Sequence, residues 1–152
     1  MLFDGDMTDT ETLGQLRAVI SKLARQFNAT ATGAGLTPTQ ASVLALIAAR
    51  GPLGLTELAR LEGLNPTMLS RVVGKLTELG LIQRDPDPAD LRAIQVEATA
   101  AGRKIHDRVK LLRTEAIGHC LDELPPASVR SIVDALPALD DLAQALRRST
   151  DG

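Results

Sequence analysis

The sequence predicts a mainly α-helical fold, in which two short helices and a β-hairpin lie between longer helices at both ends of the chain. Apolar residues recur at helical spacing over most of the 152 residues. Helix-capping signals separate successive helices, and between Gly80 and Thr99 the apolar period changes from helical to alternating. A chain of this length with 44% hydrophobic and 24% charged residues is expected to form one domain with a buried core.

A helix and a capping motif open the chain. Apolar residues at helical spacing begin at Leu13 and fade into a small, polar run over residues 28–35. Thr37-Pro38-Thr39-Gln40 then combines an N-cap hydroxyl, a proline at the first helical position and a glutamine three residues after the cap. A second helix is therefore expected from this motif to Gly51.

Two short helices joined by a tight turn come next. The first covers Leu55–Glu62 and is followed by Gly63, where a left-handed cap is favoured. Asn65 caps the second helix and Pro66 occupies its first position; its apolar face ends at Gly80. This arrangement predicts a helix-turn-helix.

The segment after Gly80 is typical of a β-hairpin, which would form the wing of a winged helix. We expect a strand over residues 81–84, a turn over 85–90 whose two prolines cannot donate ladder hydrogen bonds, and a returning strand over 92–98. The residues of the returning strand expected to face the core are Ile94, Val96 and Ala98.

The terminal helices carry more apolar surface than a winged helix of this size covers on its own. A long helix is expected from Thr99 to the Leu124-Pro125-Pro126 break, and a last helix, which Pro137 should kink or break, extends to Leu146. A second copy of the chain would cover these faces; a monomer that folds them back on itself is the alternative. The expected dimerisation residues are Leu13, Leu16, Ile20, Leu112, Ile117, Leu121, Ile132, Leu136, Leu139 and Leu142.

The polar side of the Asn65-capped helix is the candidate functional surface. Thr67, Ser70, Arg71, Gly74 and Lys75 lie opposite the apolar stripe. A helix fits the DNA major groove, where arginine pairs with guanine, a hydroxyl bonds a base edge or phosphate, and a glycine permits close approach to the backbone. A merely solvated polar face is the alternative.

Charge and aromatic content narrow the class of nucleic acid. The net charge is −2, yet the stretch from Arg60 to Lys110 has nine Lys or Arg and seven Asp or Glu, so a basic surface is local and modest. Only Phe3 and Phe27 are aromatic, which disfavours proteins that stack single-stranded bases on aromatic rings.

The order of these motifs resembles the MarR (multiple antibiotic resistance regulator) family. Leu55-Thr56-Glu57-Leu58-Ala59 is similar to its helix-turn-helix entry, the segment 64–76 to its recognition helix, and Gly80-Leu81-Ile82-Gln83-Arg84 to the exit into its wing. Asp90-Leu91-Arg92, with Val96 and Thr99, resembles the wing signature. The resemblance extends from about Leu13 to Leu146; Ala98, where the family has a larger apolar residue, and Pro137 depart from it.

This resemblance implies a winged helix-turn-helix whose N- and C-terminal helices form a dimerisation domain. It divides the chain into an N-terminal tail and helix (1–35), a DNA-binding lobe (36–99) and C-terminal dimerisation helices (100–152). It implies a homodimeric transcriptional regulator, usually a repressor, that binds a palindromic operator in double-stranded DNA and is released by a small aromatic or phenolic effector. The implied DNA-binding residues are Thr56, Pro66, Thr67, Ser70, Arg71, Lys75, Arg84, Asp90 and Arg92. A winged helix used only for protein interaction is the alternative.

The wing also has an interpretation from its residues alone. On an extended chain the side chains of Asp90 and Arg92 share a face, so Asp90 would hold the Arg92 guanidinium in position for a narrow minor groove. An exposed ion pair that only rigidifies the turn is the alternative. Arg84 is expected to contact phosphate or to pair with Asp85 or Asp87.

The remaining residues offer little chemistry. Cys120 is expected to be buried packing, and His106 and His119 have no cluster of further ligands, so neither redox nor metal sensing is expected. No catalytic or cofactor-binding motif occurs, which predicts a non-enzyme without a cofactor. An acidic N-terminus and the lack of a long apolar run predict a cytoplasmic protein that does not enter the membrane.

Overall fold

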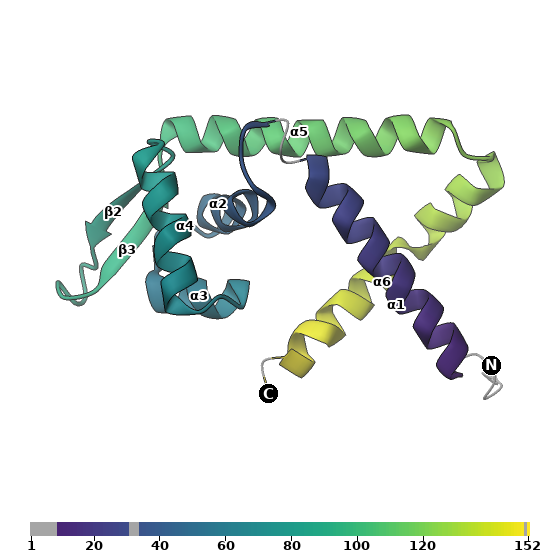
Figure 1. Cartoon of the computed structure of the whole chain (residues 1–152), viewed down its shortest axis with the longest axis horizontal. Helices are drawn as coiled ribbons and strands as arrows, with labels where there is room; N and C mark the ends of the chain where they lie inside the picture. Colours follow the sequence, from purple (N-terminus) through teal and green to yellow (C-terminus); the bar gives the residue numbers. More distant parts are fainter. Residues whose placement is uncertain (1–8, 31–33, 151) are drawn as a thin grey trace. The chain divides into compact units, whose positions relative to one another are not determined.

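The computed structural model describes residues 9–30, 34–150 and 152, and within them the fold is mainly helical with one small antiparallel sheet (Figure 1). The expected fold class is confirmed. The expected N-terminal tail and part of the polar run over 28–35 lie outside the described residues. In chain order, the elements are α1 (Thr10–Ala29), α2 (Pro38–Arg50), β1 (Leu53–Gly54), α3 (Leu55–Glu62), α4 (Pro66–Glu78), β2 (Ile82–Pro86), β3 (Ile94–Ala98), α5 (Ala100–Asp122) and α6 (Pro126–Thr150).

The chain forms two compact units, Met1–Arg113 and Thr114–Gly152, so α5 passes from one into the other. The first unit holds the helix-turn-helix, the sheet and α1. The second holds the end of α5 and α6.

Short-range hydrogen bonds fix the helix boundaries that the sequence predicts. The Thr37 Oγ1 accepts from the Gln40 amide at 3.2 Å, and the Gln40 Oε1 accepts from the Thr37 amide at 3.0 Å, which completes the capping box of α2. Gly63 ends α3 in the left-handed conformation with φ of 64°. The Asn65 Oδ1 accepts from the Met68 amide at 2.8 Å at the start of α4.

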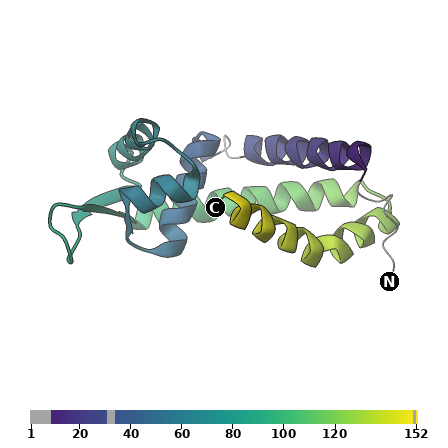
Figure 2. The same ribbon diagram turned by 90° about the horizontal axis from the view of Figure 1, so that it is seen from below.

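The sheet has the order β1-β3-β2, and both pairings are antiparallel. β2 extends to Pro86, which pairs with Ile94, so the strand is longer and the returning strand shorter than the sequence predicts. Val96 and Ala98 are buried as expected. The expectation for Ile94 is wrong: it is 42% exposed, because its pair lies at the outer end of the hairpin, beyond the core. The hairpin is the wing, seen at the far left of Figure 2.

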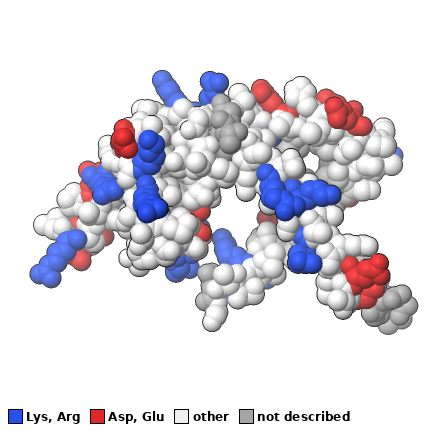
Figure 3. All heavy atoms as spheres, in the orientation of Figure 1, with Lys and Arg blue, Asp and Glu red and all other residues white. Residues whose placement is uncertain are grey.

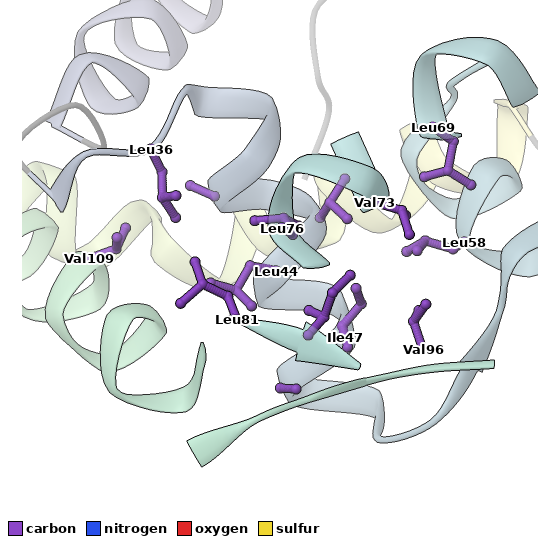
Figure 4. Packing of buried hydrophobic residues seen from close by; sticks show 14 residues of the cluster. Leu36, Leu44, Ile47, Leu58, Leu69, Val73, Leu76, Leu81, Val96 and Val109 are labelled. Atoms are coloured by element: carbon purple, nitrogen blue, oxygen red, sulfur yellow. The ribbon is translucent and has the colours of Figure 1, made fainter. Parts of the chain in front are cut away.

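The buried core lies in the winged helix. Figure 4 shows its side chains converging from α2, α3, α4 and β3. Val109 adds the first part of α5, and no buried polar or charged side chain occurs among the described residues. The buried hydrophobic residues are Leu36, Ala41, Val43, Leu44, Ile47, Leu58, Leu69, Val73, Leu76, Leu81, Ile82, Val96, Ala98 and Val109.

A close backbone approach joins the start of α5 to the start of the wing. The Thr99 amide donates to the Leu81 carbonyl at 3.0 Å, while the Thr99 Oγ1 donates to the Gly80 carbonyl at 2.7 Å and accepts from the Gly102 amide at 3.0 Å. A Cβ atom on Gly102 would overlap the Leu81 carbonyl oxygen. Any larger residue at this position would force the start of α5 away from the wing.

The first and last helices, α1 and α6, have no buried side chains among the described residues. No described residue of α1 or α6 is buried, and the large apolar residues of both helices are mostly exposed. Pro137 was expected to kink or break the last helix; of these two effects the break is wrong, because α6 continues through Pro137. In α1, Phe27 lies under the Arg113 guanidinium, whose Cζ is 4.7 Å from the ring centroid.

Candidate nucleic-acid interface

α4 divides into a buried and an exposed face, as its sequence period predicts. Leu69, Val73 and Leu76 pack into the core, which fixes the rotation of the helix. The side chains of the opposite face are consequently exposed. Those named as candidate DNA-binding residues are Pro66, Thr67, Ser70, Arg71 and Lys75.

A shallow hollow of about 190 Å³ separates α3 from the first turns of α4. Three residues that line it are candidate DNA-binding residues, and the other three are apolar. The lining residues are Leu55, Thr56, Ala59, Pro66, Leu69 and Ser70. The sequence analysis named Thr56, Pro66 and Ser70 but did not predict the hollow, since it forms only when the two helices are placed together.

Arg84 lies beside α4 rather than in an ion pair with the turn. Its Nη2 is 4.0 Å from the position that a Cβ atom would take on Gly74. Among the described residues no ion pair joins Arg84 to Asp85 or Asp87. The Asp85 carboxylate accepts from the Gln83 side-chain amide at 3.4 Å, and the Asp87 Oδ1 accepts from the Ala89 amide at 2.8 Å. Of the two alternatives for Arg84, the ion pair is therefore wrong.

The wing turn is held by backbone and carboxylate hydrogen bonds. Asp90 and Arg92 lie in a turn rather than on an extended strand. The Asp90 Oδ1 accepts from the Arg92 backbone amide at 3.0 Å, and the Asp90 carbonyl accepts from the Ala93 amide at 2.9 Å. The expected ion pair between the two side chains is absent from this described segment. Asp90 shapes the turn and leaves the Arg92 guanidinium exposed.

The cations near α4 are either unpaired or weakly paired. In the described part of the chain, Arg71 has no ion-pair partner, and Lys75 Nζ lies 3.9 Å from a Glu78 carboxylate oxygen in a well-exposed pair. Exposed pairs of this kind contribute about 0 to 1 kcal/mol, so little energy opposes transfer of such a cation to a phosphate. In the face shown in Figure 3, Lys and Arg side chains project from the winged-helix elements, with acidic side chains between them.

One pair on α3 is better formed. Arg60 Nη2 lies 3.0 Å from Glu57 Oε1. The hydrogen bond from Arg60 lowers the pKa of the Glu57 carboxyl, with added attraction from Arg60 and Arg50. The pair stabilises an exposed turn of α3 and leaves Glu57 ionised in the neutral range.

Other chemistries find no site in the described residues. These contain no cluster of three or more metal-ligating side chains and no helix long and apolar enough to cross a membrane. The expectation that Cys120 is buried is wrong, because its side chain is exposed near the end of α5.

The order of elements and the exposed face of α4 define the class. A short helix, a tight turn, a capped second helix and a β-hairpin that returns to the core make a winged helix-turn-helix.

Comparison with known proteins identifies the family. Residues 36–94 match the MarR family. An uncharacterized HTH-type transcriptional regulator of Mycobacterium bovis is 26% identical over 137 residues, which cover 88% of this chain and 96% of the relative. The resemblance is therefore confirmed: residues 36–94 match the MarR family, and most of the chain is similar to HTH-type transcriptional regulators. Because the family and its relatives are regulators and not enzymes, the expectation of a non-enzyme is also confirmed.

Solved structures show the same fold. The chain superposes on wild-type MarR (apo form) from E. coli with a TM-score of 0.74 at 24% identity, covering 84% of this chain and 95% of MarR. It also superposes on a mutant MarR from E. coli complexed with operator DNA, with a TM-score of 0.64 at 21% identity, covering 90% of this chain and 98% of that protein.

Proposed function

We propose that the protein is a homodimeric repressor that binds a palindromic operator in double-stranded DNA through α4 and the wing. The observation that carries this proposal is the polar face of α4, where Ser70, Arg71 and Lys75 are exposed opposite a buried apolar face. The likeness to a MarR protein complexed with operator DNA supports the same use of this face. The proposed contacts comprise all the candidate residues from Thr56 to Arg92 named above.

The first and last helices support the dimer. α1 and α6 bury no described residue, yet each exposes a row of large apolar side chains, among them Leu13 at 52% and Leu136 at 55%. Exposed apolar rows of this kind favour a partner surface, and a second copy supplies one by two-fold symmetry. Within this proposal residues 36–99 form the DNA-binding lobe, and 1–35 with 100–152 form the dimerisation domain.

Release by a small aromatic or phenolic effector completes the proposed function. It is supported by the family resemblance alone, and no pocket residue is assigned to it. Such an effector would act by binding the DNA-incompetent arrangement of the dimer more tightly than the competent one.

Electrophoretic mobility shifts on the promoter beside the protein's own gene, at two salt concentrations, test DNA binding. Arg71→Ala should weaken specific binding by about 5- to 150-fold, since a bidentate base contact discriminates by about 1–3 kcal/mol. Lys75→Ala should weaken all sequences alike and flatten the salt dependence, as loss of one phosphate contact does. Arg147→Ala, in the last turn of α6, is the matched control for loss of a positive charge. Failure of the wild type to shift any duplex would favour a protein-interaction module.

A further inference from the structure

We propose that the hollow between α3 and α4 reads a thymine by accepting its C5-methyl group. The inference rests on the proposed function, and it names one base that the protein distinguishes and the residues that distinguish it.

The lining of the hollow suits a methyl group. Its floor is formed by Leu55, Ala59 and Leu69, of which Leu69 is 3% exposed. No charged side chain of the described residues lines it, so no ion pair with a phosphate forms within the hollow itself. The hollow, at about 190 Å³, has ample room for a methyl group. Transfer of a methyl group from water into such a place is favourable.

The rim of the hollow carries the matching polar groups. The side chains of Thr56 and Ser70 border the apolar floor, each with a hydroxyl that can donate or accept a hydrogen bond. In the major groove, thymine displays its methyl group beside the O4 acceptor, whereas cytosine displays an amino donor and no methyl. Because a hydroxyl can pair with either base, the apolar floor is what favours thymine over cytosine.

The position of the hollow brings it to the bases. Pro66 and Ser70 are four residues apart on the first two turns of α4, and they share the side that faces α3. In a helix-turn-helix, the N-terminal residues of the second helix are those that contact base edges. The exposed Arg71 follows Ser70 directly, so both residues belong to the part of α4 that would contact the DNA.

Deoxyuridine substitution tests the proposal, because it removes only the methyl group. Each thymine of a selected operator is replaced singly by deoxyuridine, and the dissociation constant is measured for the wild type. One thymine in each half-site should be sensitive. Its replacement in one half-site should lower the affinity about fourfold, and in both half-sites about sixteenfold, which corresponds to about 0.8 kcal/mol for each buried methyl.

Ala59→Leu supplies the protein side of the test, because the larger side chain projects into the hollow and takes up space at the apolar floor that the methyl group would contact. This variant should bind the thymine and deoxyuridine operators equally. Ala49→Leu, an exposed alanine of α2 outside the hollow, should keep the wild-type ratio. Pro66→Ala, which opens the rim and keeps the floor, should lower the ratio and provides a second variant should Ala59→Leu fail to fold.

The outcomes separate this inference from the function beneath it. Specific operator binding with no thymine sensitive to deoxyuridine would overturn the methyl-reading hollow and leave the regulator intact. The proposal is also overturned if one thymine is sensitive in the wild type but the ratio of dissociation constants for the deoxyuridine and thymine operators is unchanged in Ala59→Leu, or in Pro66→Ala should Ala59→Leu fail to fold. Absence of sequence-specific binding by the folded wild type would overturn the proposed function and this inference with it.

Discussion

Gly102→Ala should destabilise the protein, although alanine is normally the better helix former. The residue lies in the first turn of α5, and an added Cβ atom would overlap the Leu81 carbonyl oxygen. That oxygen accepts from the Thr99 amide at 3.0 Å, so it belongs to the junction between the wing and α5. A backbone oxygen cannot rotate away as a flexible side chain does. The start of α5 must therefore move from the wing.

Three contributions set the size of the effect. Overpacking of a close contact costs about 1 to 3 kcal/mol. Loosening of the hydrogen bond between Thr99 and Leu81 adds about 0.5 to 1.5 kcal/mol. The helix propensity of alanine returns at most about 1 kcal/mol relative to glycine. With the full propensity gain subtracted, the free energy of unfolding should fall by about 0.5 to 3.5 kcal/mol.

Urea unfolding followed by circular dichroism, at one fixed subunit concentration, measures this change. Gly118→Ala is the matched control, because it makes the same substitution in the same helix where nothing lies within 4 Å of the added Cβ atom. This control should raise stability by up to about 1 kcal/mol, through helix propensity. If the two variants shift stability in the same direction, the close approach at Gly102 does not govern the junction.

Three further predictions concern the dimer, acid stability and the wing. Leu136→Asp should shift sedimentation from dimer to monomer, while Ser131→Asp in the same helix should not; dimers of both variants would refute the role of α6. Because Arg60 lowers the pKa of Glu57, that pair stabilises the fold above the unfolded-state pKa and the contribution is lost as the pH falls through the lower folded-state value. Glu57→Gln should therefore lose less stability between neutral and acidic urea titrations than the wild type does, and equal losses would count against the pair. Asp90→Ala should weaken operator binding while Asp90→Asn, which retains an oxygen to accept from the Arg92 amide, should bind like the wild type; equal defects would restore the ion-pair interpretation.

Local signals in the sequence predicted the helix boundaries well. The caps at Thr37 and Asn65 act on amides three residues along the chain, and Gly63 ends α3 through its own backbone conformation. Such interactions depend on neighbours in sequence, which a pattern reveals. Strand β1 was not predicted because its two residues become a strand only by pairing with β3, far along the chain.

The candidate interface likewise has features that the sequence predicts and features that depend on tertiary packing. The exposure of Arg71 and Lys75 follows from the helical period, which the sequence contains. The approach of Arg84 to Gly74 depends on how β2 leaves α4, and the hollow depends on how α3 packs beside α4, so neither follows from spacing. The prediction for the wing turn was wrong because the Asp90 carboxylate accepts from a backbone amide, a choice that spacing alone does not decide.

The placement of the core has a consequence for how loss of the dimer would act on DNA binding. Every buried apolar side chain of the described residues lies between Leu36 and Val109, whereas α6 contributes none. A charge at Leu136 should therefore remove the partner subunit without unfolding the DNA-binding lobe. A dimer that binds two linked half-sites can have an affinity about 10²–10⁴ times that of one lobe on one half-site. The variant should lose this factor on a full palindromic operator. The same variant should bind an isolated half-site as the wild-type lobe does; a lobe that unfolds on losing its partner would fail on both.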